Sequence, residues 1–286
     1  MNKRRIGTVS VGEIGLGACL LSNEGRPDQA QAVATIHAAL EGGVTLVDTA
    51  DAYAISDADF GHNEVLVRRA LETYGGAAGD VLVATKGGHT RHGVAWGRNG
   101  EPEYLKQACR DSLRRLGVEA IGLYQLHWPD PRVPYAESIG ALRDLLDEGL
   151  VQMVGISNAD ASQIGVALEV LGGRLASVQN ELSISVRAGE AEMAICAAHD
   201  IAFLAYQPLA GRDAAAGLGR RHSRLQQIAD ERGVSPQRVA IAWLLAKSPN
   251  VIPIPGARRP ETIMDSLQAA EIRLTPRETD ALDEPW

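Results

Sequence analysis

Short apolar segments rich in β-branched residues alternate along the chain with longer segments whose apolar residues recur every three to four positions. The first pattern is typical of buried strands and the second of amphipathic helices. In residues 28–41, for example, Val33, Ile36 and Leu40 fall on one helical face, and residues 136–148 repeat the pattern. Eight strands are predicted, at residues 13–17, 45–49, 81–86, 121–127, 151–157, 177–180, 202–206 and 251–255.

Glycine and proline stand where the helical segments end and begin. Glycines follow the predicted helices at positions 42, 75, 117, 149 and 172, and a glycine just after the last turn commonly ends a helix. Pro102, Pro236 and Pro260 stand at predicted first turns, where a missing N–H removes no helical hydrogen bond. These positions therefore support the same division into strands and helices.

Eight strand–helix units in a chain of 286 residues favour a (β/α)8 barrel (TIM barrel), which typically takes about 250 residues. A doubly wound sheet of five or six strands is the weaker alternative, and Gly15-Leu16-Gly17 lacks the third glycine of a dinucleotide fingerprint. No linker divides the chain, so we expect an α/β fold with a single barrel domain over residues 1–286. A short N-terminal hairpin is expected at residues 8–12, and two extra helices at 234–247 and 275–282.

Composition and charge narrow the class of function. Hydrophobic residues make up 45% and charged residues 22% of the chain, which is ordinary for a globular protein. The net charge of −8 provides no basic surface for nucleic acid or an anionic membrane, and we expect neither as a partner. No apolar run approaches the roughly 20 residues of a membrane span, and the three cysteines form no disulfide or metal pattern. We expect a soluble, cytoplasmic protein that acts on small molecules, and no oligomeric state is predicted.

Polar residues stand at the ends of six predicted strands. They are Asp48, Lys86, His127, Ser157 with Asn158, Gln179 with Asn180, and Tyr206. Because the carboxyl ends of barrel strands meet at one rim, where such folds place their active sites, we expect these side chains to share one mouth. Each also has a structural interpretation: Asp48 as a loop cap, Lys86 as a strand-end side chain reaching solvent, His127 as a core histidine. Tyr53, in the loop after Asp48, has packing as its structural interpretation.

Taken together, Tyr53, Lys86, Asp48 and His127 point to proton chemistry at a carbonyl oxygen. A lysine cation beside a phenol favours the phenolate, so we expect a lowered tyrosine pKa, with Asp48 keeping Lys86 charged. A neutral His127 would polarise the same oxygen. Reduction also needs a hydride, which no side chain supplies, so an organic cofactor is implied.

The chain resembles the aldo-keto reductases over essentially its whole length, in motifs that follow the family's order. The motifs are Asp48-Thr-Ala-Asp-Ala-Tyr53, Gly61-His-Asn-Glu64, Ala84-Thr-Lys86-Gly-Gly, Leu126-His127-Trp-Pro-Asp, Gly155-Ile-Ser157-Asn158, Val178-Gln179-Asn180, Tyr206-Gln-Pro-Leu and Ile254-Pro-Gly-Ala-Arg258. The resemblance implies an NADPH-dependent reductase of carbonyl compounds. It places the catalytic tetrad at Asp48, Tyr53 as general acid, Lys86 and His127.

The resemblance also implies a set of cofactor-binding residues. Ser157, Asn158 and Gln179 would bind the nicotinamide carboxamide, Tyr206 would stack on its ring, and the segment from Gly256 to Arg259 would hold the adenosine phosphate. The full set is Gly17, Ala18, Asp48, Ser157, Asn158, Gln179, Tyr206, Gln207, Pro208, Leu209, Gly211, Ile254, Gly256, Ala257, Arg258, Arg259, Thr262, Asp265 and Ser266. Asp265-Ser266 replaces the frequent Glu-Asn pair, and Ala257 and Thr262 also depart from common residues. The resemblance implies NADP(H) as the preferred cofactor, and these departures leave NAD(H) as the alternative.

The substrate is expected to be a carbonyl compound or a sugar-like alcohol, held by Tyr53, Trp96, His127 and Trp128. The chain stops soon after the last predicted helix, and residues 213–219 are rich in glycine and alanine, so an open mouth with loose recognition is expected. His89 and His92 lie in the loop 87–100, but no third ligand accompanies them, and no metal site is predicted.

Three other functions are less well supported by the sequence. A catalytically weak NADP(H)-binding regulatory or sensor barrel is the main alternative, and the intact tetrad argues against it. A short-chain dehydrogenase is excluded by spacing, because its tyrosine and lysine stand four apart on one helix, whereas Tyr53 and Lys86 lie on different elements. A hydrolase or isomerase barrel is disfavoured by the lack of paired carboxylates or a metal cluster at the strand ends.

Overall fold

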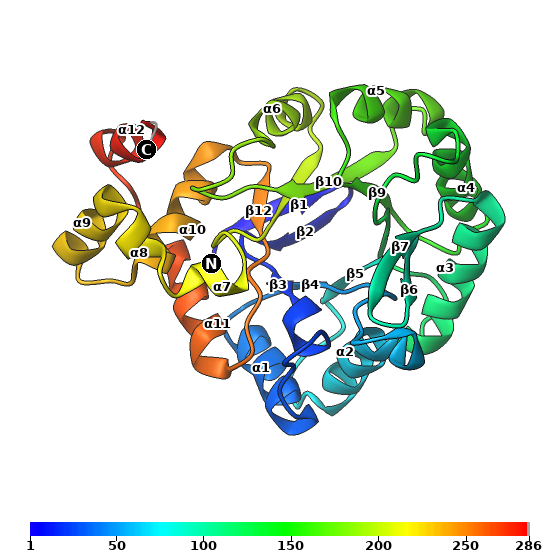
Figure 1. The fold of residues 1–286 in the computed structure, drawn as a ribbon, viewed down its shortest axis with the longest axis horizontal. Coiled ribbons are helices and arrows are strands. Elements are labelled where there is room, and N and C mark those ends of the chain that lie inside the picture. Colours follow the sequence, from blue (N-terminus) through cyan, green and yellow to red (C-terminus); the bar gives the residue numbers. More distant parts are fainter. Residues whose placement is uncertain (285–286) are drawn as a thin grey trace.

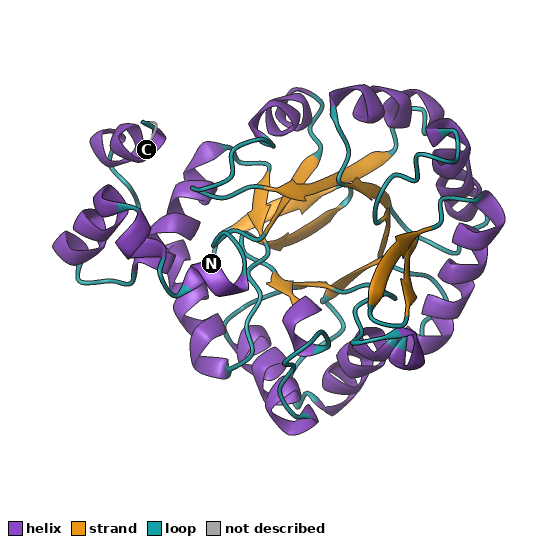
Figure 2. Ribbon diagram, viewed as in Figure 1, coloured by secondary structure: helices purple, strands orange, loops and turns teal. Residues whose placement is uncertain are grey.

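Eight parallel strands form a barrel, as predicted, in a computed structural model that describes residues 1–284. Around the barrel, each strand pairs with the next, as Figures 1 and 2 show. The strands are β3 (Leu16–Gly17), β4 (Leu46–Asp48), β5 (Leu82–Gly87), β8 (Leu123–Leu126), β9 (Val154–Ser157), β10 (Leu175–Glu181), β11 (Ala202–Tyr206) and β12 (Val251–Pro253). The sheet closes where the amides of Gly15 and Gly17 donate to the carbonyl oxygens of Pro253 and Pro255, at 3.0 and 3.1 Å.

A ring of helices surrounds the barrel. It consists of α1 (Gln29–Glu41), α2 (His62–Thr73), α3 (Pro102–Leu116), α4 (Tyr135–Asp147), α5 (Ala161–Val170), α6 (Glu190–Ala198), α10 (Pro236–Lys247) and α11 (Pro260–Leu267). The predicted boundary residues hold: prolines open α3, α10 and α11, and Gly117 ends α3 in a left-handed conformation with φ of 71°. Three short 3-10 helices, η1 (Ala18–Leu21), η2 (Asp57–Asp59) and η3 (Gln268–Glu271), lie in the connections.

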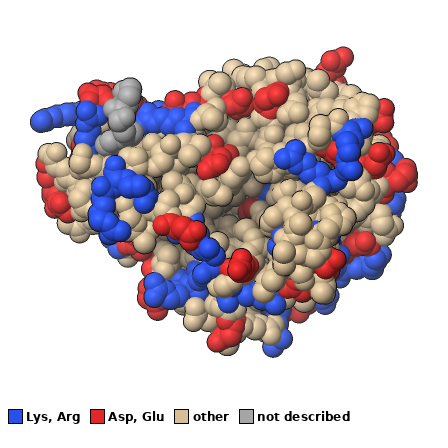
Figure 3. Space-filling view, in the orientation of Figure 1, with Lys and Arg blue, Asp and Glu red and all other residues tan. Residues whose placement is uncertain are grey.

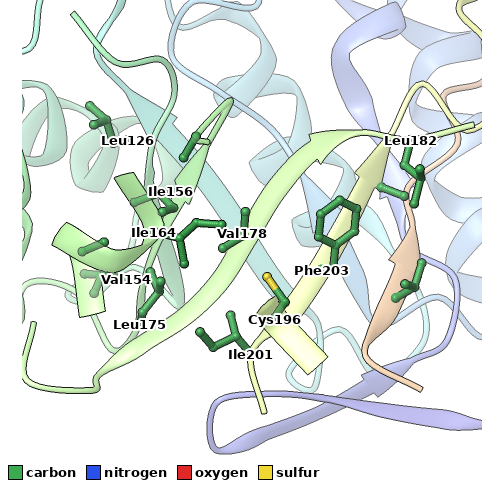
Figure 4. Packing of buried hydrophobic residues seen from close by; sticks show 14 of the residues in the cluster. Leu126, Val154, Ile156, Ile164, Leu175, Val178, Leu182, Cys196, Ile201 and Phe203 are labelled. Carbon is green, nitrogen blue, oxygen red and sulfur yellow. The ribbon is translucent and has the colours of Figure 1, made fainter. Parts of the chain in front are cut away.

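Strand alternation divides the apolar residues between the barrel interior and the helices outside. Leu46, Leu82, Leu123 and Leu204 belong to one interior cluster. Residues that alternate with interior positions along a strand, such as Val178 in β10 and Phe203 in β11, pack outward against the helical layer (Figure 4). Every second position toward the carboxyl end of a strand therefore faces the barrel interior at the mouth.

Two hairpins cover opposite ends of the barrel. The first hairpin pairs β1 (Lys3–Ile6) with β2 (Val9–Gly12), and its Ile6 and Val11 are buried in the interior cluster that contains Leu46. It is longer than the predicted 8–12 segment. The second, β6 (His89–His92) with β7 (Ala95–Arg98), stands beside the mouth in Figure 1, within residues 87–100, which we expected to be a loop.

The helices outside the ring differ in part from the prediction. The final helix is present as α12 (Pro276–Asp283). The helix predicted at 234–247 is α10, but it packs on β12 within the ring, because Ile241 and Trp243 on its two sides are fully buried. The outer layer is formed instead by α9 (Ser223–Arg232) with α12 and the short helix α8 (Leu218–Arg221). The short helix α7 (Arg212–Ala215) follows β11 and lies next to the barrel (Figure 1). Within residues 1–284, no helix combines the length and apolar character that crossing a membrane requires.

The closing seam generates a stability prediction at Gly17. A Cβ at this position would stand 2.7 Å from the carbonyl oxygen of Ile254, which is backbone and cannot turn away. Gly17→Ala should therefore lower the free energy of unfolding by about 1–3 kcal/mol. Gly165→Ala is the matched control, because that glycine lies exposed in α5 with open space around it, and it should add about 0.5–1 kcal/mol. Chemical denaturation measures both, and an unchanged stability of Gly17→Ala would contradict the tight seam.

Candidate active site

A buried lysine stands at the centre of the mouth. The Lys86 ammonium donates to Asp48 Oδ1 at 2.6 Å and to the carbonyl oxygen of Thr49 at 2.9 Å, and it contacts the Tyr53 hydroxyl at 3.1 Å. Lys86 is fully buried and Asp48 nearly so. These three contacts match the three N–H donors of an ammonium, so Lys86 is held in one orientation. The structure therefore brings together three of the residues predicted for the tetrad.

The second oxygen of Asp48 is held by amides from other strands. Gln179 Nε2 donates to Asp48 Oδ2 at 2.8 Å, and Gln125 Nε2 approaches it at 3.5 Å. Ser177 in turn donates to Gln125 Oε1 at 3.1 Å. Gln125 was not predicted as a site residue, because it does not stand at a strand end. It follows Leu123 by two residues in β8 and so shares its interior direction.

The loop that carries Tyr53 is fixed by backbone contacts. The Asp51 amide donates to the carbonyl oxygen of Lys86 at 3.3 Å. From β6, the Arg91 guanidinium donates to the carbonyl oxygens of Ala54 and Ile55, the latter at 3.2 Å. Arg91 thus ties the hairpin beside the mouth to the tyrosine loop, and no motif in the sequence marked it.

The pKa of Tyr53 moves in the direction opposite to our expectation. Burial, followed by the negative charge of Asp48, holds the pKa of Tyr53 well above its ordinary value of about 10. Lys86 does not reverse this, because Asp48 lies closer to the ammonium than the phenol does and balances its charge. Tyr53 is consequently a neutral phenol at physiological pH, which is the form that donates a proton.

His127 completes the predicted tetrad and is neutral as well. Its backbone amide donates to the carbonyl oxygen of Gly87 at 2.8 Å, and its ring lies 5.5 Å from the Tyr53 ring, centre to centre, at 82°. Burial, then the charge of Lys86, lowers the pKa of His127 well below its ordinary value. Its Nδ1 is buried, and within residues 1–284 it has no hydrogen-bond partner.

Aromatic rings line the mouth around His89. Its ring centre lies 4.5 Å from that of His127, 4.8 Å from Trp96 and 5.6 Å from Trp128. Burial, then the charge of Arg98, lowers the pKa of His89 to about 4. The predicted pocket residues therefore do meet, and His89, considered in the sequence only as a metal ligand, joins them. Across the described part of the chain, no group of three His, Cys, Asp or Glu residues is arranged for a metal ion.

A chain of hydrogen bonds joins the predicted amide-binding residues to one another and to the backbone of His127. Tyr206 donates its hydroxyl to Asn158 Oδ1 at 2.7 Å, and Asn158 Nδ2 donates to the carbonyl oxygen of His127 at 3.0 Å. Ser157 donates to the carbonyl oxygen of Gln179 at 2.8 Å. Asn180 is used locally, because its side chain braces Ala159 through both amide atoms.

The backbone beside these residues adopts an uncommon conformation. Asn158, Gln207 and Ala210 have φ of 57°, 49° and 62°, and Gly211 has φ of 86°. Non-glycine residues in this region carry a conformational cost and cluster at functional sites. The loop after β11, which includes the predicted Pro208 and Leu209, therefore presents a strained edge to the mouth.

The predicted phosphate-binding segment lies across the seam between β3 and β12. Gly17 bridges to Gly256, Ala18 follows it in buried backbone, and Ile254 and Ala257 are buried. Arg258 donates to the carbonyl oxygen of Glu24 at 2.7 Å, and its buried Nε lacks a hydrogen-bond partner in the described chain. Arg259 is exposed at the residue before α11.

The end of this segment is engaged within the protein. Asp265 accepts from Ser235 at 2.7 Å and from Arg238 at 2.6 Å, while Ser266 donates to the carbonyl oxygen of Thr262 at 3.2 Å. The substitutions noticed in the sequence thus have structural partners here. Figure 3 shows the mouth as a hollow bordered by basic and acidic side chains.

The chain matches known proteins over nearly all of its length. The family model for the aldo/keto reductase family matches residues 13–286. Pyridoxine 4-dehydrogenase of Escherichia coli is 30% identical, over 99% of this chain and 97% of its own. The glycerol dehydrogenase AKR11B4 of Gluconobacter oxydans superposes with a TM-score of 0.83 at 30% identity, over 98% and 94% of the two chains. An aldo/keto reductase of Klebsiella pneumoniae, solved with NADP and acetate, gives 0.81 at 27% identity, over 99% and 95%.

The buried carboxyl group of Asp51, two residues before Tyr53, generates a prediction about pH. Both oxygens of Asp51 are buried and lack hydrogen-bond partners among residues 1–284. Burial, then the negative charge of Glu64, raises the pKa of Asp51 well above its ordinary value. The folded protein therefore keeps a proton that the unfolded chain releases above about pH 4, and stability falls as pH rises toward the folded pKa.

Asp51→Asn should remove this loss. We expect the variant to gain stability relative to the unmodified protein as pH rises. The difference in free energy of unfolding, variant minus unmodified, should be larger at pH 7 than at pH 5, by up to about 1.4 kcal/mol per pH unit. Urea unfolding at both pH values measures the difference. The control is Asp200→Asn, at an exposed left-handed residue that asparagine tolerates. An Asp51→Asn effect that is the same at both pH values would contradict the buried neutral acid.

Proposed function

Because the chain belongs to the aldo/keto reductase family, we propose that it is an NADP(H)-dependent enzyme of a single barrel domain that reduces an aldehyde or ketone to an alcohol. The reverse reaction would oxidise a sugar-like alcohol. The observation that supports this most is the contact of the neutral Tyr53 hydroxyl with the buried ammonium of Lys86. A phenol in that position can donate a proton and be stabilised afterwards.

The residues at the mouth fit a nicotinamide dinucleotide phosphate. Asn158 and Gln207, beside the mouth, have left-handed backbone, and Arg258, whose Nε is unpartnered among residues 1–284, immediately precedes the N-cap of α11. A helix N-terminus flanked by arginines suits a phosphate. The Klebsiella relative that this chain resembles was solved with NADP, which supports the same cofactor.

In this proposal the cofactor lies across the mouth from the amide residues to the seam. Ser157, Asn158 and Gln179 would hold the carboxamide, and Tyr206 would stack on the ring. Arg258 and Arg259 would bind the adenosine phosphate. Bound NADPH supplies a hydride, for which side chains have no equivalent.

Four side chains of this protein would manage the proton. Tyr53 and the neutral His127 orient the substrate by hydrogen bonds to its carbonyl oxygen, and Tyr53 delivers its proton to that oxygen as the carbon is reduced. Lys86 stabilises the tyrosinate that remains, and Asp48 keeps Lys86 in place. Solvent then returns a proton to Tyr53. The raised pKa of Tyr53 keeps the phenol neutral near pH 7, which is the form that reduction requires.

Removing the tyrosine hydroxyl tests the proposed function. Tyr53→Phe should lower kcat for aldehyde reduction by about 10²- to 10⁴-fold, since general acid catalysis typically contributes that much. NADPH affinity should change only a few-fold, because the cofactor would rest on other strands. Absorbance of NADPH follows turnover, fluorescence titration follows binding, and Tyr74→Phe, outside the mouth at the end of α2, is the control. Retention of more than about a tenth of kcat would remove Tyr53 from the mechanism, and NADPH binding without turnover in the unmodified protein would favour a sensor.

Cofactor preference gives a second test. We expect NADPH to bind more tightly than NADH, because Arg258 and Arg259 offer charge-assisted contacts to the 2′-phosphate. Replacing the contacting arginine by methionine should weaken NADPH binding about 10- to 100-fold and leave NADH nearly unchanged. NADH is thus the control ligand within each variant. Equal affinities of the unmodified protein for both cofactors would contradict a phosphate site in this segment.

A further inference from the structure

A second hollow opens beside the proposed active site. Its volume is about 290 Å³, and it lies between the end of β7, the loop after β8 and the starts of α4 and α5. Arg98, Trp128, Tyr135, Asn158 and Gln163 line it. Two of these also border the mouth: Trp128 is stacked at 5.6 Å on His89, and Asn158 accepts the hydrogen bond from Tyr206. The hollow therefore shares two of its lining residues with the mouth where a carbonyl substrate would react.

Arg98 brings an uncompensated positive charge to this hollow. Its guanidinium lies 4.7 Å above the ring of Trp128 and makes one long contact, of 3.4 Å, to the carbonyl oxygen of Pro129. No carboxylate in residues 1–284 lies within ion-pair distance of it. Asp130 also borders the hollow, but Arg132 binds that carboxylate at 2.8 Å, and the Gly100 amide donates to it at 3.1 Å. The acidic group at this site is thus already neutralised, and Arg98 is not.

Two further side chains that line the hollow carry hydrogen-bonding groups without a partner among residues 1–284. The Tyr135 hydroxyl is buried and makes no hydrogen bond within the described residues. Gln163 accepts from the Asp160 amide through Oε1 at 3.0 Å, which leaves its NH₂ group as the free end. Asp160, the other acidic residue nearby, already accepts from the Gln163 backbone amide at 2.8 Å. A buried polar group without a partner is costly, so a ligand that accepts from Tyr135 would be favoured.

The donors at this site specify the chemistry of the ligand. A guanidinium, a phenol and an amide NH₂ all donate hydrogen bonds, and the group that they match is an oxyanion, a carboxylate or a phosphate ester. The volume is at the lower end for ligand pockets and suits part of a small molecule. We propose that this hollow is a substrate subsite in which Arg98, Tyr135 and Gln163 bind the anionic far end of a small aldehyde. This inference rests on the proposed function, because the aldehyde would react at Tyr53.

Matched aldehydes test the subsite. The probes are 4-carboxybenzaldehyde, 4-formylphenyl phosphate and the neutral methyl 4-formylbenzoate, and kcat/KM is measured for each with NADPH. We expect at least one anionic aldehyde to exceed the neutral ester by about 10- to 100-fold, the usual range for a charge-assisted contact. The better of the two anions identifies the oxyanion that the site takes.

Three variants identify the residues responsible. Arg98→Gln should bring the anion-to-ester ratio of kcat/KM close to one while turnover of the ester stays within about threefold. Tyr135→Phe should lower the ratio less and should not lower stability, since it removes a buried hydroxyl that makes no hydrogen bond within residues 1–284. The control Arg69→Gln removes an equal charge from the exposed face of α2 and should leave the ratio intact. Turnover of all three aldehydes without anion preference, or a preference that survives Arg98→Gln, would overturn the subsite.

A binding measurement separates this inference from the proposed function. Calorimetry with 4-(hydroxymethyl)benzoate in the presence of NADP⁺ should show binding to the unmodified protein that Arg98→Gln weakens about tenfold or more. If that holds while no aldehyde is reduced, the subsite stands and the proposed function fails. If the ester is reduced but the benzoate binds both proteins equally, the proposed function stands and the subsite is refuted.

Discussion

The ion pair between Lys86 and Asp48 is the constraint on which the rest of the site depends. Two charges removed from water are costly, and their mutual attraction offsets this only when the remaining donors and acceptors are also bound. Here the Thr49 carbonyl and the Tyr53 hydroxyl accept the remaining hydrogen bonds of the Lys86 ammonium, and Gln179 donates to the second oxygen of Asp48. Removing one partner of such a pair typically costs about 3–5 kcal/mol, so strands β4, β5 and β10 are held in register by their polar ends as well as by their apolar bodies.

The same arrangement sets the protonation of the groups around it. A lysine whose charge is balanced by Asp48 does not pull the proton from Tyr53, and burial then keeps the phenol neutral. His127 lies in the same dry environment and is held neutral by burial and by the charge of Lys86. The site thus contains one fixed ion pair surrounded by neutral hydrogen-bonding groups. That combination suits the delivery of a proton to a carbonyl oxygen, followed by stabilisation of the anion left behind.

Much of this could be predicted from the sequence, because barrel strands impose a period of two. Each of the site residues Asp48, Lys86 and Gln179 comes two positions after an interior residue of its own strand, namely Leu46, Ala84 and Ser177. Strand alternation therefore predicts that the three side chains meet in the barrel interior. The same argument applies to Gln125, which the inspection of strand ends alone overlooked. Confirmation of the barrel and of the family likewise reflects patterns that extend over the whole chain.

What could not be predicted depends on contacts between segments far apart in sequence. The β6–β7 hairpin lacks a strong turn signal, so the roles of Arg91 and His89 beside the mouth were not visible. The prediction of a lowered Tyr53 pKa was wrong because adjacency to lysine can be inferred from the motifs, whereas complete burial and the balancing charge of Asp48 cannot.

Carbon-13 NMR of ring-labelled tyrosine, with Tyr53→Phe to assign the signal, measures this pKa directly. The account predicts a Tyr53 signal that does not move between about pH 6 and about pH 9, and a titration midpoint inside that range would contradict it.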